Sequence, residues 1–181
     1  MDFQQTAIPG VILVTPQVFG DERGFFMEFW QEREFAKMGI DHSFVQDNHS
    51  RSGQGILRGL HYQIRQPQGK LVRVVSGEVF DVAVDLRKSS ATFGHWVGTR
   101  LSEESKQMIW VPPGFAHGFY VLSHSADVLY KCTDFYAPEH ERSIRWDDPD
   151  LNIQWPLGKV APILSDKDAS ASWFRDAETF Q

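Results

Sequence analysis

The stretch RGLHYQIRQPQGKLVRVVSGEVFDVAVDL, residues 58–86, places a histidine, a lysine, arginines and aspartates inside sequence that is otherwise typical of β-strands. Apolar residues alternate with polar ones along much of it, which is the pattern of a strand with one buried face. Charged side chains are rarely buried in a sheet unless they are paired or functional, because their desolvation is costly. We therefore expect a pocket inside a β-sheet core, and we expect the chemistry of the chain to lie in that pocket.

Short β-like runs, separated by Gly, Pro, Ser and Asp, continue on both sides of this stretch. Helical patterns are confined to residues 31–38 and to a C-terminal segment at about residues 168–177. The dipeptide Ser76-Gly77 lies between two strong β-like runs and predicts a tight hairpin. The expected strands are residues 11–14, 24–30, 44–49, 56–63, 70–75, 78–85, 95–101, 108–111, 118–122, 127–134 and 144–146.

This many strands with so little helix predict an all-β fold, a double-sheet jelly roll with short peripheral helices. The chain has 181 residues and contains no linker, repeat or low-complexity tract. We therefore expect a single domain over residues 1–181, large enough to bury a substantial core. A ligand would enter at the open end of the jelly roll.

Composition excludes several classes of partner. A formal net charge of −6 argues against binding to nucleic acid or to an anionic membrane, which needs a basic surface. The single cysteine, Cys132, excludes an intrachain disulfide and a cysteine-rich zinc site. We find no signal peptide and no apolar run near the roughly 20 residues that cross a bilayer, so we expect a cytoplasmic location. Neither a G-x-G-x-x-G motif nor a Walker A loop is present, so nothing supports dinucleotide or ATP use.

His61 is the first candidate for catalysis. Lys70 begins the next expected strand, and Asp81 and Asp85 share a face of the strand after it. If a hairpin at Ser76-Gly77 pairs these strands, one sheet carries a base, a cation and acids. Enzymes use such a set to tune an imidazole and to stabilise an oxyanion. The alternative is a histidine with a purely structural role in the core or on the surface.

A second motif is PPGFAHG at residues 112–118, which matches the P-x-G-x-x-H pattern of the second cupin motif. In metal-binding cupins this histidine, here His117, joins two further histidines and a glutamate. The preceding motif should read H-x-H, but this chain has His61-Tyr62-Gln63. Transition-metal sites usually need three or four suitable protein ligands, so we expect no metal site.

Tyr130 lies in the run 127–136 and shares a strand face with Val128 and Cys132. A tyrosine that points into a barrel is usually a packing residue with a hydrogen-bonded hydroxyl. In a pocket with a base opposite, it is also a suitable general acid, because it is neutral at pH 7. Arg23, Gln46-Asp47-Asn48 and Arg58 carry groups suited to an anion and a nucleobase edge, with exposed surface positions as the alternative.

Taken together, these residues resemble the dTDP-4-dehydrorhamnose 3,5-epimerase family, cupin-fold enzymes of deoxysugar nucleotide synthesis. The similarity extends over nearly the whole chain, from GDERG at residues 20–24 to LSDKD at residues 164–168. Its most specific segments are QDN at 46–48, RGLH at 58–61, GKLVR at 69–73, GEVFDVAVDLR at 77–87 and PGFAHGF at 113–119.

The resemblance implies that the chain inverts carbons 3 and 5 of dTDP-4-dehydro-6-deoxy-D-glucose without a cofactor. His61 would accept the proton, and Asp168 would pair with it. Lys70 would stabilise the enolate oxygen, Tyr130 would donate a proton from the other side of the ring, and Asp81 would be a further active-site carboxylate. The positions implied for substrate binding are Arg23, Glu28, Gln46, Asn48, Arg58, His117, Glu141 and Lys167, with Tyr136 stacking on the thymine.

The resemblance also implies a homodimer that exchanges an N-terminal strand, so that some of these residues serve the partner's site. Arg58 and His61 are an odd number of positions apart, and an ideal strand would place them on opposite faces. A bulge at Gly59 would bring them to the same side. The alternatives are a single-centre epimerase or a ketoisomerase acting on a related 4-keto sugar nucleotide, a metal-dependent cupin oxygenase, and a non-catalytic sugar-binding cupin.

Overall fold

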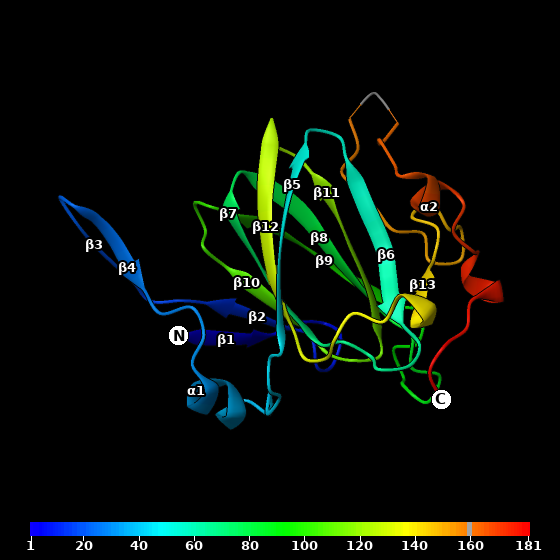
Figure 1. The fold of residues 1–181 in the computed structure, drawn as a ribbon, viewed down its shortest axis with the longest axis horizontal. Helices are drawn as coiled ribbons and strands as arrows, with labels where there is room; N and C mark the ends of the chain where they lie inside the picture. The colour runs from blue at the N-terminus through cyan, green and yellow to red at the C-terminus, as the bar shows by residue number, and fades with distance from the viewer. Residues whose placement is uncertain (159–160) are drawn as a thin grey trace.

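Two antiparallel sheets face each other in the computed structural model, which describes residues 1–158 and 161–181 (Figure 1). This is the double-sheet, all-β architecture that the sequence predicts. The six-stranded sheet has the order β1 (Asp2–Gln5), β2 (Ile12–Thr15), β10 (Met108–Val111), β7 (Lys70–Ser76), β12 (Ser125–Cys132) and β5 (Gln46–Gly53). The five-stranded sheet has the order β13 (Glu141–Ser143), β6 (Leu57–Gln63), β11 (Phe115–Val121), β8 (Glu78–Asp85) and β9 (Trp96–Ser102).

The space between the sheets is filled by apolar side chains that alternate along their strands. Val72 and Val74 of β7 and Val128 of β12 pack against Val79 and Ala83 of β8. The outer face of the five-stranded sheet is also covered, by the chain that follows β13, and a second cluster forms there. Because both of its faces are buried, β11 has no exposed residue along its length.

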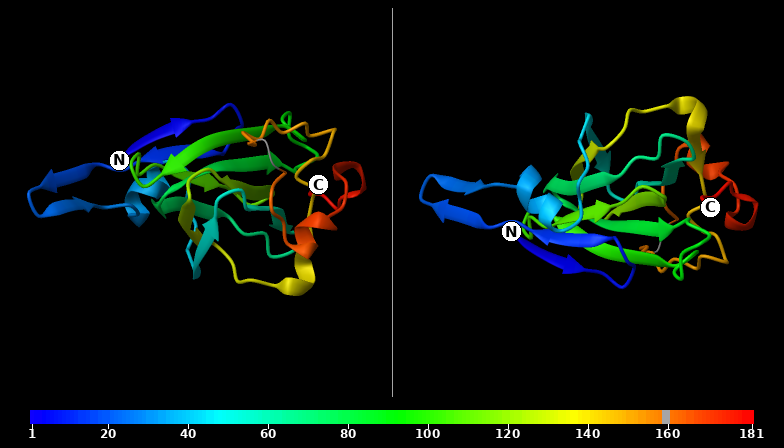
Figure 2. Two further views of the ribbon diagram at one scale, coloured as in Figure 1. Left: turned by 90° about the horizontal axis from the view of Figure 1, so that it is seen from above. Right: turned by 90° about the horizontal axis from the view of Figure 1, so that it is seen from below.

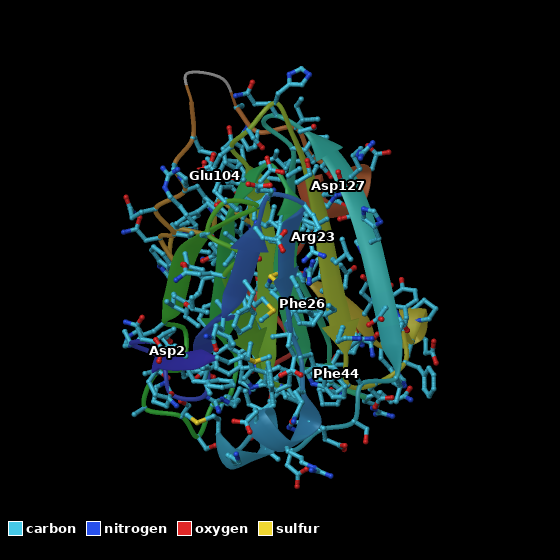
Figure 3. The ribbon with its side chains drawn as sticks, turned by 90° about the vertical axis from the view of Figure 1, so that its left-hand side faces the viewer. Asp2, Arg23, Phe26, Phe44, Glu104 and Asp127 are labelled. Carbon is cyan, nitrogen blue, oxygen red and sulfur yellow. The ribbon has the colours of Figure 1, made fainter. Side chains whose placement is uncertain are left out.

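A hairpin of β3 (Val18–Asp21) and β4 (Gly24–Met27) forms a separate two-stranded sheet. It extends away from the rest of the molecule, as the views from above and below show (Figure 2). The helix α1 (Glu32–Lys37) follows it, begins at the N-cap Gln31, and buries Phe35 beside the six-stranded sheet. Seen from the hairpin side, Arg23 and Phe26 lie in front of this sheet (Figure 3).

The remaining helical elements are single turns. They are η1 (Pro138–His140), α2 (Asp166–Ala169) and η2 (Phe174–Asp176). The sequence predicts one helical segment at about residues 168–177. The structure instead has two short turns, because Ser172 between them pairs with Ile144 as an isolated β-bridge. No helix in the described ranges is long and apolar enough to cross a bilayer.

The hairpin expected at Ser76-Gly77 is wrong. β7 pairs with β10 and β12, whereas β8 pairs with β11 and β9, so the chain crosses from one sheet to the other at Gly77. Gly77 has a φ of +76°, and a Cβ there would lie 2.1 Å from the carbonyl oxygen of Ser125. This crossing places the residues before and after Gly77 on opposite sides of the space between the sheets.

Several strand bounds also differ from those expected. β8 and β10 have the predicted bounds, but β13 covers Glu141–Ser143 and not residues 144–146. β1 and β3 were not expected, because they are short and are largely exposed, without buried alternation to indicate them.

Candidate active site

A cavity of about 350 Å³ lies between the two sheets and holds most of the predicted site residues. The five-stranded sheet forms one wall and the six-stranded sheet forms the other. The predicted residues that line it are Gln46, Asn48, Arg58, His61, Lys70, His117, Tyr130, Tyr136, Glu141 and Lys167. Asp168 and Asp81 lie behind the lining, each bonded to one of the two histidines.

His61 on β6 is tied to Asp168 on α2. The His61 Nε2 lies 2.5 Å from Asp168 Oδ1, and the Asp168 side chain is only 3% exposed, against 25% for the His61 ring. A carboxylate only accepts hydrogen bonds, so Nε2 carries the hydrogen and Nδ1 keeps its lone pair. Burial raises the pKa of Asp168, but the hydrogen bond and charge of His61, with smaller contributions from neighbours, outweigh burial and hold it below its ordinary value.

The backbone of β6 is irregular where the sequence predicts a bulge, at Gly59. On β11, His117 is paired with His61 and Phe119 with Arg58, so three steps along β6 match two steps along β11. Gly59 has a φ of +124°, and a Cβ there would lie 2.6 Å from the Cα of Gly118. The extra residue brings Arg58 and His61 to the same cavity.

A second imidazole–carboxylate pair lies beside the first. His117 Nε2 donates to both oxygens of Asp81, at 3.0 and 2.9 Å, and this pair is almost completely buried. Asp81 comes from β8, the strand next to β11, so both members belong to the sheet itself. Asp81 therefore does not line the cavity itself but is hydrogen-bonded to His117, which does.

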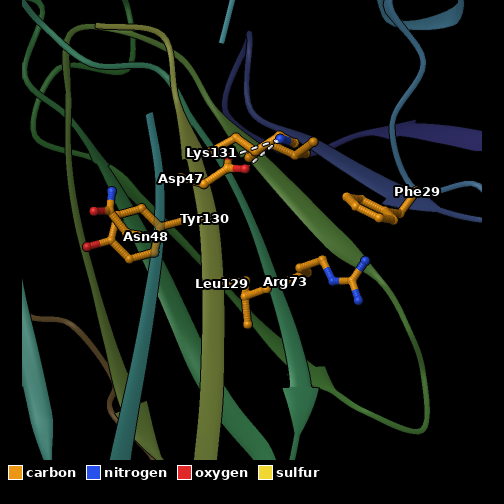
Figure 4. A pocket seen from close by; sticks show the side chains of 8 residues that line it. Phe29, Asp47, Asn48, Arg73, Leu129, Tyr130 and Lys131 are labelled. Atoms are coloured by element: carbon orange, nitrogen blue, oxygen red, sulfur yellow. Dashed lines mark hydrogen bonds and ion pairs between the residues drawn. The ribbon is translucent and has the colours of Figure 1, made fainter. Parts of the chain in front are cut away.

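The opposite wall presents Lys70 from β7 and Tyr130 from β12. Within residues 1–158 and 161–181, neither the Lys70 ammonium nor the Tyr130 hydroxyl makes a hydrogen bond or an ion pair, and Asp81 and Glu141 attract the Lys70 charge only from a distance. Desolvation lowers the pKa of Lys70 and raises the pKa of Tyr130. Figure 4 shows the Tyr130 ring and Asn48 together, on the side of β12 away from Arg73 and Phe29, as strand alternation predicts.

The rim of the cavity joins the two walls. The Tyr136 hydroxyl donates to Glu141 Oε2 at 2.9 Å, and Lys167 Nζ donates to Glu141 Oε1 at 2.7 Å. The backbone N–H of Tyr136 donates to Gln46 Oε1 at 2.9 Å, which fixes the loop after β12. The Tyr136 ring is half-exposed and offers a flat face at the entrance.

Arg23 and Glu28 are not brought to the cavity. Arg23 lies in the turn of the β3–β4 hairpin, with a side chain that is 90% exposed and paired with Asp21. Glu28 is exposed just after β4. Because the hairpin extends away from the body of the chain, neither residue reaches the cavity of its own chain.

Sequence reasoning missed two polar residues that line the cavity, Ser50 and Gln68. The alternation of β5 would have indicated Ser50, because it shares a face with Gln46 and Asn48. Gln68 lies in the loop between β6 and β7, where no periodicity points to a site. Within residues 1–158 and 161–181, no group of three or more His, Cys, Asp or Glu side chains is arranged to hold a metal ion.

This cavity has an imidazole with a free ring nitrogen on one wall and a neutral phenol with an ammonium on the other. Such a set suits an isomerase that moves protons at carbons next to a carbonyl group. A family model described as dTDP-4-dehydrorhamnose 3,5-epimerase matches residues 5–176. The chain belongs to this family of isomerases.

Individual relatives agree with the family model. The chain is 62% identical to the dTDP-4-dehydrorhamnose 3,5-epimerase of Pseudomonas aeruginosa over 181 residues, 99% of each chain. It is 55% identical to the enzyme of the same name from Shigella flexneri, again over 99% of each. A crystal structure of dTDP-6-deoxy-D-glucose-3,5-epimerase from Legionella pneumophila, in complex with dTDP-4-keto-L-rhamnose, is 54% identical, covers 98% of this chain and 94% of its own, and has a TM-score of 0.95.

Proposed function

We propose that this chain inverts carbons 3 and 5 of dTDP-4-dehydro-6-deoxy-D-glucose to give dTDP-4-dehydro-L-rhamnose. The family supports the reaction, and the similar Legionella pneumophila structure holds dTDP-4-keto-L-rhamnose. One observation carries the assignment of residues. His61 and Tyr130 come from facing sheets and line the same cavity, which Lys70 also lines.

His61 removes the proton. The 4-keto group acidifies the hydrogens on carbons 3 and 5, because the electron pair left on either carbon spreads onto the ketone oxygen as an enolate. Nδ1 of His61 is the nitrogen with the free lone pair, since Nε2 is bonded to Asp168. Asp168 holds this tautomer and stabilises the imidazolium that forms.

Lys70 stabilises the enolate and Tyr130 completes the inversion. An ammonium in a desolvated site interacts strongly with an oxyanion, and Lys70 has no partner among the described residues to neutralise it. Burial keeps Tyr130 protonated at neutral pH, so its hydroxyl can deliver a proton to the face opposite His61. The electron pair returns from the enolate oxygen to carbon and the ketone is restored, which needs no outside oxidant or reductant. His61 then releases its proton to solvent and the Tyr130 phenolate takes one up, which closes the cycle.

The other lining residues bind the rest of the substrate. The exposed Tyr136 ring stacks on the thymine, and its hydroxyl is held by Glu141. The Arg58 guanidinium supplies charge for the diphosphate or the sugar oxygens. Polar contacts to the nucleotide and the sugar come from Gln46, Asn48, His117, Glu141 and Lys167.

The active form is a homodimer in which the β3–β4 hairpin enters the partner's site. The hairpin exposes Phe19, Phe25 and Phe26, the last of them 71% exposed, which is unusual for an element with no role in association. Exchange would also deliver Arg23 and Glu28, which cannot reach the cavity of their own chain. We also propose a single-domain cytoplasmic enzyme, and the net charge of −6 argues against nucleic-acid and anionic-membrane partners.

The reaction is tested by incubating the purified protein with the 4-keto nucleotide in deuterated water and following the sugar by NMR. The wild type should incorporate deuterium at carbons 3 and 5 and form the L-sugar. His61→Ala should lose incorporation at both carbons while it still binds dTDP. Tyr130→Phe should retain exchange but form less inverted product. Exchange at one carbon only indicates a single-centre epimerase, and a displaced carbonyl indicates a ketoisomerase.

The hairpin exchange is tested by mixing two inactive variants, Arg23→Ala and His61→Ala, after dissociation and reassembly. In an exchanged heterodimer, the intact hairpin of the His61→Ala chain completes the site that still has its histidine. About a quarter of the wild-type activity should then return, because half of the dimers are mixed and each has one complete site. A mixture that stays inactive, or a protein that sediments as a monomer, contradicts the exchange.

A further inference from the structure

Both carboxylate oxygens of Asp168 accept a side-chain hydrogen bond, and the second donor is Ser165. While Oδ1 receives the hydrogen bond from His61, the Ser165 hydroxyl donates to Oδ2 at 2.9 Å. The same Ser165 oxygen accepts the backbone N–H of Asp168 at 3.1 Å. Ser165 is thus the N-cap of α2 and also a direct partner of the carboxylate that faces His61.

The segment that carries Ser165 is attached to the strand that carries His61. Ile163 donates its N–H to Gly55 O at 2.9 Å and accepts from the N–H of Leu57 at 3.0 Å, forming a parallel bridge at the start of β6. Ser165 follows this attachment by two residues. The helix α2 has only four residues, and a single helical turn is not stable by itself. The position of Asp168 therefore depends on the Ile163 bridge and the Ser165 cap.

We infer that Ser165 is a positioning residue for proton abstraction, which orients the Asp168 carboxylate and through it the His61 ring. The inference rests on the proposed role of His61 and Asp168. Each carboxylate oxygen has one side-chain partner, so the plane of the carboxylate is defined from both sides. Without the hydroxyl, Oδ2 has no other side-chain partner in the described chain, and the carboxylate is held only through its bond to His61.

Three substitutions separate the two tasks of Ser165. Ser165→Ala removes both the cap and the donor to Oδ2. Ser165→Thr keeps both, and Ser165→Asp keeps the cap acceptor but cannot donate to the carboxylate. Ser170→Ala is the matched control. Ser170 lies at the other end of α2, where its hydroxyl donates to the carbonyl of Asp166 at 2.7 Å, and it makes no hydrogen bond to the Asp168 side chain among the described residues.

The measurements are kcat, KM and the downfield proton resonance of the His61 Nε2–H. We expect Ser165→Ala to lower kcat about 10-fold, at the low end of the losses found for a histidine's outer partners, with KM changed less than about twofold. The downfield resonance should broaden or disappear, because the carboxylate that accepts from Nε2–H is no longer held on its second oxygen. Ser165→Asp should share these changes, whereas Ser165→Thr and Ser170→Ala should resemble the wild type.

Two results would overturn the inference. The first is a wild-type kcat and an intact downfield resonance in both Ser165→Ala and Ser165→Asp. The second is an equal loss in Ser170→Ala, which would indicate that any damage to α2 has the same effect. Asp168→Asn, measured alongside, distinguishes the role of Ser165 from the role of the His61–Asp168 pair. If Asp168→Asn lowers kcat and the Ser165 variants do not, only the role of Ser165 is contradicted. If Asp168→Asn is fully active, the proposed His61–Asp168 pair fails as well.

Discussion

The two walls of the cavity differ in how their polar groups are held. On the five-stranded sheet, each imidazole is bonded to a carboxylate, His61 to Asp168 and His117 to Asp81. On the six-stranded sheet, Gln46 donates to Asn48, but Lys70 and Tyr130 make no hydrogen bond or ion pair in the part of the chain that the structure describes. The two histidines are thus oriented before the substrate arrives, whereas Lys70 and Tyr130 keep their hydrogen-bonding capacity for the substrate.

This difference matches what each wall is proposed to do. A base must present one defined ring nitrogen, and only a fixed partner can select that tautomer. A group that stabilises a developing oxyanion must not be neutralised beforehand by a carboxylate of its own. The unpaired wall should therefore reduce stability, and the paired wall should support it.

The strongest test of the comparison is Lys70→Met. We expect kcat to fall about 10²- to 10³-fold, as when one oxyanion donor is removed. We also expect Tm to rise by a few degrees, because desolvation lowers the pKa of Lys70 and folding therefore disfavours its charged form at neutral pH. Steady-state kinetics and calorimetry measure both effects. A variant with lower Tm would mean that Lys70 has a stabilising partner after all.

The two carboxylates of the paired wall should differ from one another. We expect Asp168→Asn to lower kcat about 10- to 100-fold, since the outer partner of a histidine is lost, with a smaller loss of stability than at Asp81 because the His61 ring is more exposed than the His117 ring. Asp81→Asn should instead lower the free energy of unfolding by about 1–3 kcal/mol, because a buried hydrogen-bonded group loses its match within the sheet. Urea unfolding and kinetics on both variants check this. If Asp81→Asn lowers kcat more and Asp168→Asn lowers stability more, the two pairs have the opposite roles to those proposed.

The unpaired wall should also determine the basic limb of the pH profile. The pKa of Lys70 lies below its ordinary value of 10.5, so the ammonium is lost earlier as pH rises, whereas the raised pKa of Tyr130 keeps the phenol protonated. We therefore expect kcat to decline as the pH rises, with a midpoint below 10.5 that is set by deprotonation of Lys70 alone. In Lys70→Arg this limb should disappear, because a guanidinium does not deprotonate in proteins. A limb that persists unchanged in Lys70→Arg contradicts the assignment.

The smallest effect concerns the rim, where the walls meet. Tyr136 follows β12 of one sheet and Glu141 begins β13 of the other, and their hydrogen bond of 2.9 Å joins them. Tyr136→Phe keeps the stacking ring but loses this bond. KM should rise about two- to fivefold with kcat unchanged, in line with the net contribution of one hydrogen bond. An unchanged KM for the nucleotide sugar would mean that the bond to Glu141 is not needed to hold the Tyr136 ring in place for binding.

The strands around the cavity were predictable because their β-branched and apolar runs are bounded by turn residues, and β8 is a good example, with predicted and observed bounds in agreement. The sheet to which each strand belongs was not predictable. Ser76-Gly77 has the residues of a hairpin turn, but turn residues report the local backbone and not the strands that pair beyond them. The error mattered, because a hairpin would have put Lys70 and Asp81 on one sheet and not on facing walls.

The site was predicted better than the topology, since most of the expected residues line a single cavity. That success came mainly from the family resemblance, because no spacing rule connects His61 with Asp168 across more than a hundred residues. Arg23 and Glu28 show the limit of this approach. Both residues lie outside the cavity of their own chain. A sequence motif does not indicate whether a residue completes the site of its own chain or that of a partner chain.

The bulge at Gly59 has a consequence for how β6 tolerates change. One extra residue in a strand moves every later side chain to the other face. The extra residue at Gly59 therefore decides which side chains, from there to the end of β6, face the cavity. If β6 were straightened at Gly59 without losing a residue, Arg58 and His61, three positions apart, would lie on opposite faces and could no longer face the same ligand. Substitutions at Gly59 that remove the bulge should therefore be far more damaging than most changes of side chain nearby.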